Sequence, residues 1–388
     1  MKVLGAWLIP ERPRAGHALL LSLGLLALRL GAYGLVTDGL AALPRTMCQW
    51  DCGFYLRIAS AGYDLAPTAW PPDYAVTTNW AFLPAFPGLI AALAALTHWP
   101  LRLCGLVVAN AAFAGFVLVG VRYLAMVRPG TNQGGGIWFL MAFPFGFYFS
   151  LPYTESLYAL LAMSALLALE RGGLMTAGLV SAGLMVTRVT GVLLWPVLAW
   201  TGLAPAWRAW RAGDRHGAWD LAARAMPPLA IAPLGVTGLM AYFHSHVGDA
   251  LAFAHAQACW FRHFVNPFAA LLDGLLAFDV GDALFFHGQS QFLCALSGCL
   301  VLVMSVRLAL LRRYRDAWFL AATVLMAASS GLISLQRFVW ANPVMLLFLF
   351  DWLWQGRARR LMAPLLLVCA AVQLYLVYCW GAGRGGLV

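Results

Sequence analysis

Apolar runs of about 20 residues recur along almost the whole 388-residue sequence, and they restrict the fold more than any other feature. A run of this length spans the hydrocarbon core of a bilayer as an α-helix. The runs are continuous, which excludes a membrane β-barrel, because its strands alternate apolar and polar residues over about 10 positions. Only 10% of the residues are charged, whereas soluble chains have about 25%. We therefore predict an all-α polytopic membrane protein, with one domain over residues 1–388.

The arginines between the apolar runs predict how the chain is oriented in the membrane. The formal net charge is +10, and most of the basic residues lie in short segments between runs. This distribution is typical of the positive-inside rule, so we expect these segments to face the cytoplasm and anionic lipid, with no nucleic-acid partner. Lys2, Arg12 and Arg14 precede the first run, which is typical of a signal-anchor.

With the N-terminus inside, the apolar runs predict about 11 crossings. These lie at about 17–37, 103–122, 134–150, 154–169, two short helices within 174–203, 226–246, 291–311, 317–333, 338–354 and 361–380. Residues 79–97 contain Pro84 and Pro87 and form either a full crossing or a re-entrant or interfacial helix. We favour the helix that dips and returns, because it keeps the later arginines inside.

Three segments outside the crossings have a distinct composition. Residues 38–78 form a large first outer loop with four aspartates, and residues 49–61 of it are expected to form an interfacial helix. Residues 204–224 contain four arginines and three tryptophans and predict an amphipathic segment on the cytoplasmic surface. Residues 247–290 form a second outer loop with a single arginine, Arg262, and aspartates that we expect to face solvent.

The cysteines show no metal-ligand spacing, and most of the eight lie within apolar runs, where they act as small hydrophobic residues. Cys48 and Cys52 are the two that lie close together in a loop. They either form a disulfide or simply flank Asp51, and we favour free thiols.

The predicted topology brings several polar residues to one depth on the outer side. They are Asp51, Asn79, Tyr153, Glu155, Arg188, Gln336 and Arg337. Ionisable side chains are costly in hydrocarbon, so such residues are candidates for function. A carboxylate can accept the proton of an attacking hydroxyl, and the planar fork of a guanidinium matches phosphate oxygens. This set suits a reaction in which a phosphate is the leaving group.

Each of these residues also has a structural alternative. Arg188 and Arg337 could form buried ion pairs with Glu155 and Asp51. Glu155 follows Thr154 at a predicted helix start, where an acid interacts favourably with the helix dipole. Asp51 could instead be a solvated acid in a loop.

A series of short motifs over residues 50–345 resembles the PIG-V family, the mannosyltransferases that add the second mannose to glycosylphosphatidylinositol, and its bacterial relatives. The motifs are Trp50-Asp51 with Tyr55-Leu56-x-Ile58-Ala59 and Gly62-Tyr63, Ala81-Phe82-Leu83-Pro84-x-Phe86-Pro87, Phe143-Pro144, Ser150-Leu151-Pro152-Tyr153-Thr154-Glu155-Ser156-Leu157, Thr187-Arg188-x-x-Gly191, and Gln336-Arg337-Phe338 with Asn342-Pro343. The motif from Pro152 to Ser156 is the most specific, and all of them occur in the family's order.

The resemblance implies a GT-C fold with a catalytic acid in a large first extracytoplasmic loop. It implies that Asp51 is the general base and that Arg188 and Arg337 bind the phosphate of the donor. Pocket residues are then expected at Trp50, Tyr63, Asn79, Tyr153, Glu155 and Gln336. The aromatic residues near Asp51 could equally anchor the loop in the membrane interface.

We therefore expect a membrane glycosyltransferase that moves a hexose from a polyprenyl-phosphate donor to a lipid or glycan acceptor, with inversion. Mannose follows from the resemblance alone. The length and composition are typical of a bacterial protein, so we expect the inner membrane and a site that faces the periplasm; bacteria lack glycosylphosphatidylinositol, which leaves the acceptor open. The chemistry requires no cofactor or metal but leaves room for a divalent cation.

Two other functions remain as alternatives: a lipid-linked sugar transporter or flippase, and a non-catalytic partner of another glycosyltransferase. A transporter needs polar residues through the whole depth of the membrane, whereas here they cluster at one depth. A non-catalytic partner would be expected to lack the base, and Asp51 is present.

Overall fold

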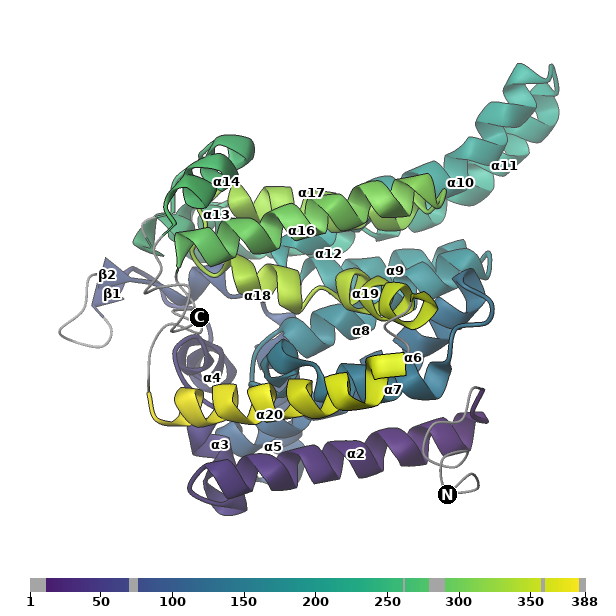
Figure 1. Cartoon of the computed structure of the whole chain (residues 1–388). Coiled ribbons are helices and arrows are strands. Elements are labelled where there is room, and N and C mark those ends of the chain that lie inside the picture. The colour runs from purple at the N-terminus through teal and green to yellow at the C-terminus, as the bar shows by residue number, and fades with distance from the viewer. Residues whose placement is uncertain (1–11, 70–75, 261, 279–289, 357–359, 384–388) are drawn as a thin grey trace.

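The fold is described from a computed structural model, which covers residues 12–69, 76–260, 262–278, 290–356 and 360–383. Helices dominate these ranges, and α2 and α20 lie side by side in Figure 1. A two-stranded antiparallel sheet pairs β1 (Thr68–Ala69) with β2 (Val76–Thr77). The prediction of an all-α membrane architecture is confirmed.

Six helical segments among the described residues are long and apolar enough to cross a membrane. They are α2 (Ala15–Val36), α6 (Leu101–Val127), Val189–Arg211, Arg215–Val247, α16 (Gln291–Leu310) and α20 (Met362–Gly381). A seventh candidate combines η3 (Pro144–Ser150) with α8 (Glu155–Glu170), which meet at 96°. Shorter apolar helices are α5 (Ala85–Thr97), α9 (Leu174–Met185), α14 (Pro267–Leu276) and α19 (Pro343–Gln355). The expected number of crossings therefore stays a prediction.

Helix α8 lies in the core and packs along both α6 and α9. Its small residues Ala159, Ala162 and Ala165 are completely buried, which allows close approach of the neighbouring helices. Glu155 is its first residue and Glu170 its last, so the helix has a carboxylate at each of its ends.

The expected crossing at 134–150 is wrong as a single helix. Helix α7 (Gln133–Ala142) ends before Pro144, and η3 follows as a separate 3-10 helix. Proline lacks the backbone N–H that would continue the α-helical hydrogen bonds. The expected break near Arg188 is confirmed, because α9 ends at Met185 and η4 (Val189–Leu193) precedes α10 (Leu194–Arg211).

Residues 204–224 do not form one separate helix, and their expected place on the cytoplasmic surface stays a prediction. They belong to α10 and α11 (Arg215–Ile231), which pack against each other and project from the body as a hairpin (Figure 1). The turn between them contains Gly213 at φ +88°, and the Asp214 carboxylate accepts a 2.8 Å hydrogen bond from the Gly217 N–H. Helix α12 (Leu234–Val247) follows α11.

Helix α5 begins near Arg188, because the Ala85 N–H donates a 3.0 Å hydrogen bond to the carbonyl of Val186. After a short turn α6 begins, and a Cβ at Gly105 would lie 2.9 Å from Pro152 Cβ. Pro152 and Arg188 both belong to the motifs expected near the site. The start of α5 and the start of α6 therefore both lie near motif residues, and whether residues 79–97 cross the membrane or dip and return stays a prediction.

The two expected outer loops contain short elements. The first contains η1 (Leu40–Ala42), α3 (Leu43–Thr46) and α4 (Cys52–Ala61), and η2 (Asn79–Ala81) follows it. The second contains α13 (Ala252–His255), η5 (Ala256–Trp260) and α14. Helices α17 (Tyr314–Ala328) and α18 (Leu335–Trp340) precede α19. Asp73, Asp279, Asp282 and His287 lie outside the described residues.

Candidate functional site

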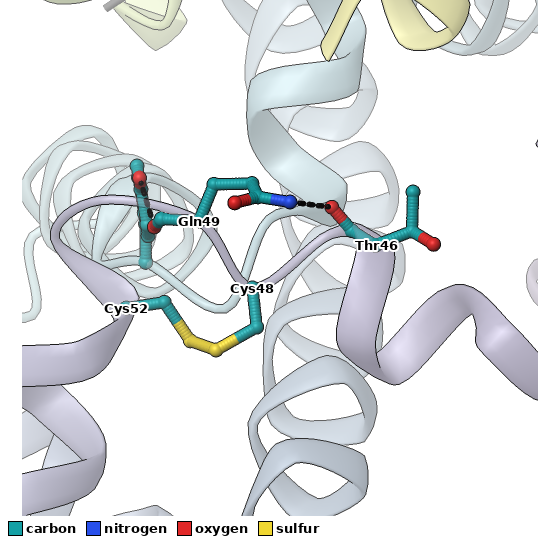
Figure 2. Close-up of a disulfide and its surroundings, with 5 residues drawn as sticks. Thr46, Cys48, Gln49 and Cys52 are labelled. Atoms are coloured by element: carbon teal, nitrogen blue, oxygen red, sulfur yellow. Dashed lines mark hydrogen bonds between the residues drawn. A yellow bond between two sulfur atoms is a disulfide. The ribbon is translucent and has the colours of Figure 1, made fainter. Parts of the chain in front are cut away.

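A short loop closed by a disulfide positions Asp51 at the start of α4. Cys48 and Cys52 are bonded, so the expectation of free thiols is wrong; their Cα atoms lie 5.2 Å apart, within the range that a disulfide spans. Figure 2 shows this bridge beside Gln49, whose amide points to the carbonyl of Thr46. Trp50 has φ +46°, a conformation that is unfavourable for a residue with a side chain. The loop therefore leaves Asp51 little backbone freedom.

Asp51, Glu155, Arg188 and Arg337 form one network of alternating charge. The Arg337 Nη1 donates a 2.8 Å hydrogen bond to Asp51 Oδ2. The Nε of Arg337 lies 3.0 Å from Glu155 Oε1, and Arg188 Nη1 lies 3.3 Å from the same oxygen. The network joins the first loop, the start of α8, the break before η4, and α18. The sequence prediction that these four residues meet agrees with the geometry.

The network is largely buried, and its contacts differ in kind. The Glu155 side chain is 1% exposed, while those of Arg337 and Asp51 are 10% and 20% exposed. Neither oxygen of Glu155 accepts a hydrogen bond from the described residues, so its charge is compensated by ion pairing alone. The Arg337 guanidinium lies over the ring of Tyr153 at 5.2 Å from its centroid. Arg188 and Arg337 therefore do form the ion pairs with Glu155 and Asp51 that were expected from the sequence as a structural alternative.

A cavity of about 320 Å³ opens beside this network. Its charged lining residues are Asp51, Arg188, Arg262 and Arg337. The rest includes hydroxyl, apolar and aromatic groups, among them Tyr55, Phe82, Thr154, Thr187, Phe253, Trp260, Ser329, Ser330 and Phe338. Clefts that combine a few polar groups with apolar walls are typical of small-molecule sites. The cavity can therefore hold an anionic group attached to an apolar or sugar moiety.

Tyr63 and Asn79, predicted as pocket residues, do not line this cavity. The Tyr63 hydroxyl donates a 2.7 Å hydrogen bond to the carbonyl of Phe82, and its ring packs against Phe243. Asn79 is fully buried and donates a 3.1 Å hydrogen bond to the carbonyl of Gly62. These two hydrogen bonds link the first loop to residues 79–82, so both side chains support the shape of that loop.

Trp50, Tyr153 and Gln336 also lie outside the lining of the cavity. Trp50 is 59% exposed. Tyr153 is buried behind Arg337, and its hydroxyl donates a 2.8 Å hydrogen bond to the carbonyl of Gln49. Gln336 is buried next to Arg337 in α18. Tyr153 thus links the loop that holds Asp51 to the arginine that pairs with it.

Arg262 of the second loop lines the same cavity, although it is not among the site residues predicted from the sequence. Its neighbour Trp260 packs edge-on against Phe54 and Phe82, with centroids 5.6 Å away in each pair. Burial lowers the pKa of the Arg262 guanidinium; the charges of Arg337 and Arg188 also lower it, and Asp51 opposes them. The signal available in the sequence is that Arg262 is the single arginine in residues 247–290.

No group of three or more His, Cys, Asp or Glu side chains that could hold a metal ion occurs in the part of the chain that the structure describes. The two carboxylates of the network contact guanidinium groups. The expected independence from metals and cofactors stays a prediction.

Comparison with known proteins gives weak similarities. No protein-family model matches the sequence, and no curated protein matches it. An oligosaccharyltransferase of Archaeoglobus fulgidus, solved in complex with zinc and sulfate, has a TM-score of 0.45 and 12% identity, covering 93% of this chain and 53% of its own. A structure of AglB, the archaeal oligosaccharyltransferase from the same organism, with an inhibitory peptide and a dolichol-phosphate, has a TM-score of 0.45 and 11% identity, covering 94% and 56%.

This chain therefore spans about half the length of those two oligosaccharyltransferases, 53% and 56%. Similarity at this level indicates neither a substrate nor a mechanism for this chain. The PIG-V resemblance is matched by no family model and stays a prediction.

Proposed function

We propose that this chain is a membrane glycosyltransferase of the GT-C type, which moves a hexose from a polyprenyl-phosphate donor to a hydroxyl of an acceptor. The observation that supports this most directly is the cavity in which Asp51 lies beside the guanidinium groups of Arg188 and Arg337. A proton acceptor and anion-binding groups that face the same space are what transfer from a sugar phosphate requires.

The reaction is a single displacement at the anomeric carbon. Asp51 accepts the proton of the acceptor hydroxyl while the oxygen of that hydroxyl forms the new bond to the anomeric carbon. On the opposite face, the bond between the carbon and the phosphate oxygen breaks, and its electron pair leaves with the lipid phosphate. Guanidinium groups stabilise the charge that develops on this phosphate, so the chemistry needs no covalent intermediate on the enzyme.

The contacts of Asp51 are compatible with this role. Arg337 binds its Oδ2, and among the described residues no hydrogen bond is made to Oδ1. The side chain is 20% exposed, and Asp51 lines the cavity. A hydroxyl can therefore approach Oδ1 from the cavity while Arg337 holds the other oxygen.

The finer assignments follow the sequence resemblance. The sugar is mannose, and the acceptor is a lipid or a glycan. The site faces the extracytoplasmic side of a bacterial inner membrane, and the anomeric centre is inverted. A transfer assay tests the sugar and the inversion.

The test is sugar transfer by purified protein in lipid nanodiscs, with polyprenyl-phosphate mannose and polyprenyl-phosphate glucose as donors and a membrane-lipid extract as acceptor. We expect transfer from the mannose donor, and the anomeric configuration of the product, read by NMR, opposite to that of the donor. If neither donor is consumed by protein that is folded, the proposed function is wrong. If glucose is transferred instead, the enzyme class stands and the sugar is corrected.

A further inference from the structure

We infer that Arg262 is the main ligand of the donor's phosphate diester, and that Arg337 serves instead to position Asp51. The identity of the ligand as a lipid-linked sugar phosphate rests on the proposed function. The existence of an anion site at Arg262 rests only on the geometry of the cavity.

The charges around the cavity are unequal. Three guanidinium groups, those of Arg188, Arg262 and Arg337, meet two carboxylates, those of Asp51 and Glu155. The excess is one positive charge, and a phosphate diester carries one negative charge. Repulsion among like charges is strong where solvent is partly excluded, so an anion that binds between them is favoured.

Arg337 is already committed to other groups. Its Nη1 and Nε contact Asp51 and Glu155 at 2.8 and 3.0 Å, and its guanidinium lies over the Tyr153 ring. If Arg337 turned to a phosphate, a buried carboxylate would lose its partner, which is strongly unfavourable. Its contacts instead suit a group that holds Asp51 in place.

Arg188 is partly committed. Its Nη1 lies 3.3 Å from Glu155 Oε1, and its guanidinium lies over the Phe338 ring, with the centroid 4.2 Å away. Arg188 also lines the cavity and can add a second contact to an anion bound by Arg262.

Arg262 has no carboxylate within ion-pair distance among the described residues. Its guanidinium donates a long hydrogen bond, 3.4 Å, from Nη2 to the carbonyl of Ile333. Exchanging this contact for a phosphate oxygen would leave no charged group without a partner. Among the three arginines, Arg262 therefore loses least when it binds an anion.

The backbone on both sides of Arg262 is attached to the body. Trp260 packs on Phe54 and Phe82, and the Val265 N–H donates a 2.8 Å hydrogen bond to the carbonyl of Ser329. These contacts hold Arg262 at the cavity before any ligand arrives, which reduces the entropy lost on binding.

Binding of a polyprenyl phosphate without sugar tests this inference, with the uncharged polyprenol of the same length as reference. The protein is the full chain in nanodiscs of phosphatidylcholine, so that no anionic head group competes. We expect Arg262→Gln, which can still donate to Ile333, to weaken binding of the phosphate by about 10- to 100-fold and to leave binding of the alcohol unchanged. Arg262→Lys keeps the positive charge but lacks the planar guanidinium, so its affinity for the phosphate should lie between those of the parent and of Arg262→Gln.

Arg45→Gln is the matched control, because Arg45 is exposed in α3 of the first loop and does not line the cavity. Equal unfolding temperatures of all variants show that each is folded. Inorganic phosphate added at millimolar concentration separates the sources: a lipid-linked anion should not be displaced by it, whereas a site for free phosphate should.

If Arg262→Gln binds the lipid phosphate as tightly as the parent does, the inference is overturned, whatever the transfer assay shows. If binding depends on Arg262 but the parent transfers no sugar, the anion site stands and the proposed function fails. A parent that does not prefer the phosphate to the alcohol contradicts both.

Discussion

Asp51 and Arg337 lie 286 residues apart in the sequence, and Oδ2 of the first accepts a 2.8 Å hydrogen bond from Nη1 of the second. The contact connects the first loop to α18 at the edge of the cavity. The position of the expected base, Asp51, therefore depends directly on the position of α18.

The first prediction concerns Asp51→Asn. The amide cannot accept a proton from the attacking hydroxyl, so we expect the turnover rate to fall by about 10²–10⁴-fold. The amide still fits beside Arg337, and binding of the donor lipid should change little. Turnover and donor binding are measured on the same preparation.

Asp249→Asn provides the control for that variant. Asp249 contacts His255 at 2.7 Å in the second loop and does not line the cavity. We expect parental turnover from it. Near-normal turnover by Asp51→Asn would remove Asp51 from the mechanism.

The second prediction compares the two ends of α8. Glu155→Gln removes the carboxylate that Arg188 contacts at 3.3 Å and one of the two that Arg337 contacts. Because these charges are buried, the loss should destabilise the fold by about 3–5 kcal/mol. The unfolding temperature, followed by intrinsic fluorescence in detergent, should fall clearly.

Glu170→Gln is the matched substitution at the last residue of the same helix. Glu170 is 19% exposed, and its partner Arg313 keeps a second carboxylate, Asp316, at 2.8 Å. A negative charge at a helix C-terminus is also unfavourable to the helix dipole. We expect a much smaller decrease in unfolding temperature, and an equal decrease would show that the burial of Glu155 is not what matters.

The four charged residues of the network could be predicted from the sequence for a physical reason. Charged side chains in apolar surroundings need partners, so Asp51, Glu155, Arg188 and Arg337 had few alternatives but to meet. Which oxygen pairs with which guanidinium depends on how α18 is placed by its packing against α16 and α17, and no local pattern carries that information. The structure shows Arg337 between both acids.

Other features depend on contacts that sequence patterns do not reveal. Asn79 donates a hydrogen bond to the carbonyl of Gly62 because two turns approach each other. The sequence motif that contains Asn79 does not indicate this contact. Arg262 lies in a loop where a lone arginine is expected to be solvated. The packing of Trp260 on Phe54 and Phe82, together with the hydrogen bond from Val265 to Ser329, brings it to the cavity.

The third prediction concerns Gly191, the third residue of the short helix η4 that follows Arg188. A Cβ at this position would lie 2.6 Å from the carbonyl oxygen of Leu184, a contact that requires backbone movement. We expect Gly191→Ala to destabilise the fold by about 1–3 kcal/mol and to reduce sugar transfer by displacing Arg188.

Gly183→Ala in α9 is the control for that substitution. The nearest atom to its Cβ is Leu161 Cδ1 at 3.9 Å, an ordinary contact. Replacing glycine within a helix should stabilise it by about 0.5–1 kcal/mol. Opposite shifts in unfolding temperature for the two variants are expected, and a stabilised Gly191→Ala would contradict the close packing at η4.

The last prediction uses the disulfide to determine which side of the membrane the site faces. Disulfides persist in oxidising compartments and are reduced in the cytosol. If Asp51 faces outward, Cys48 and Cys52 should resist alkylation in freshly prepared membranes until a reductant is added. Cys259, a free and partly exposed thiol of the second loop, should be alkylated without reduction and so shows that the reagent reaches this end of the protein. Peptide mass spectrometry after alkylation reads all three positions at once. Immediate alkylation of Cys48 and Cys52 together with Cys259 would place the site on the reducing side, where a periplasmic donor could not reach Asp51.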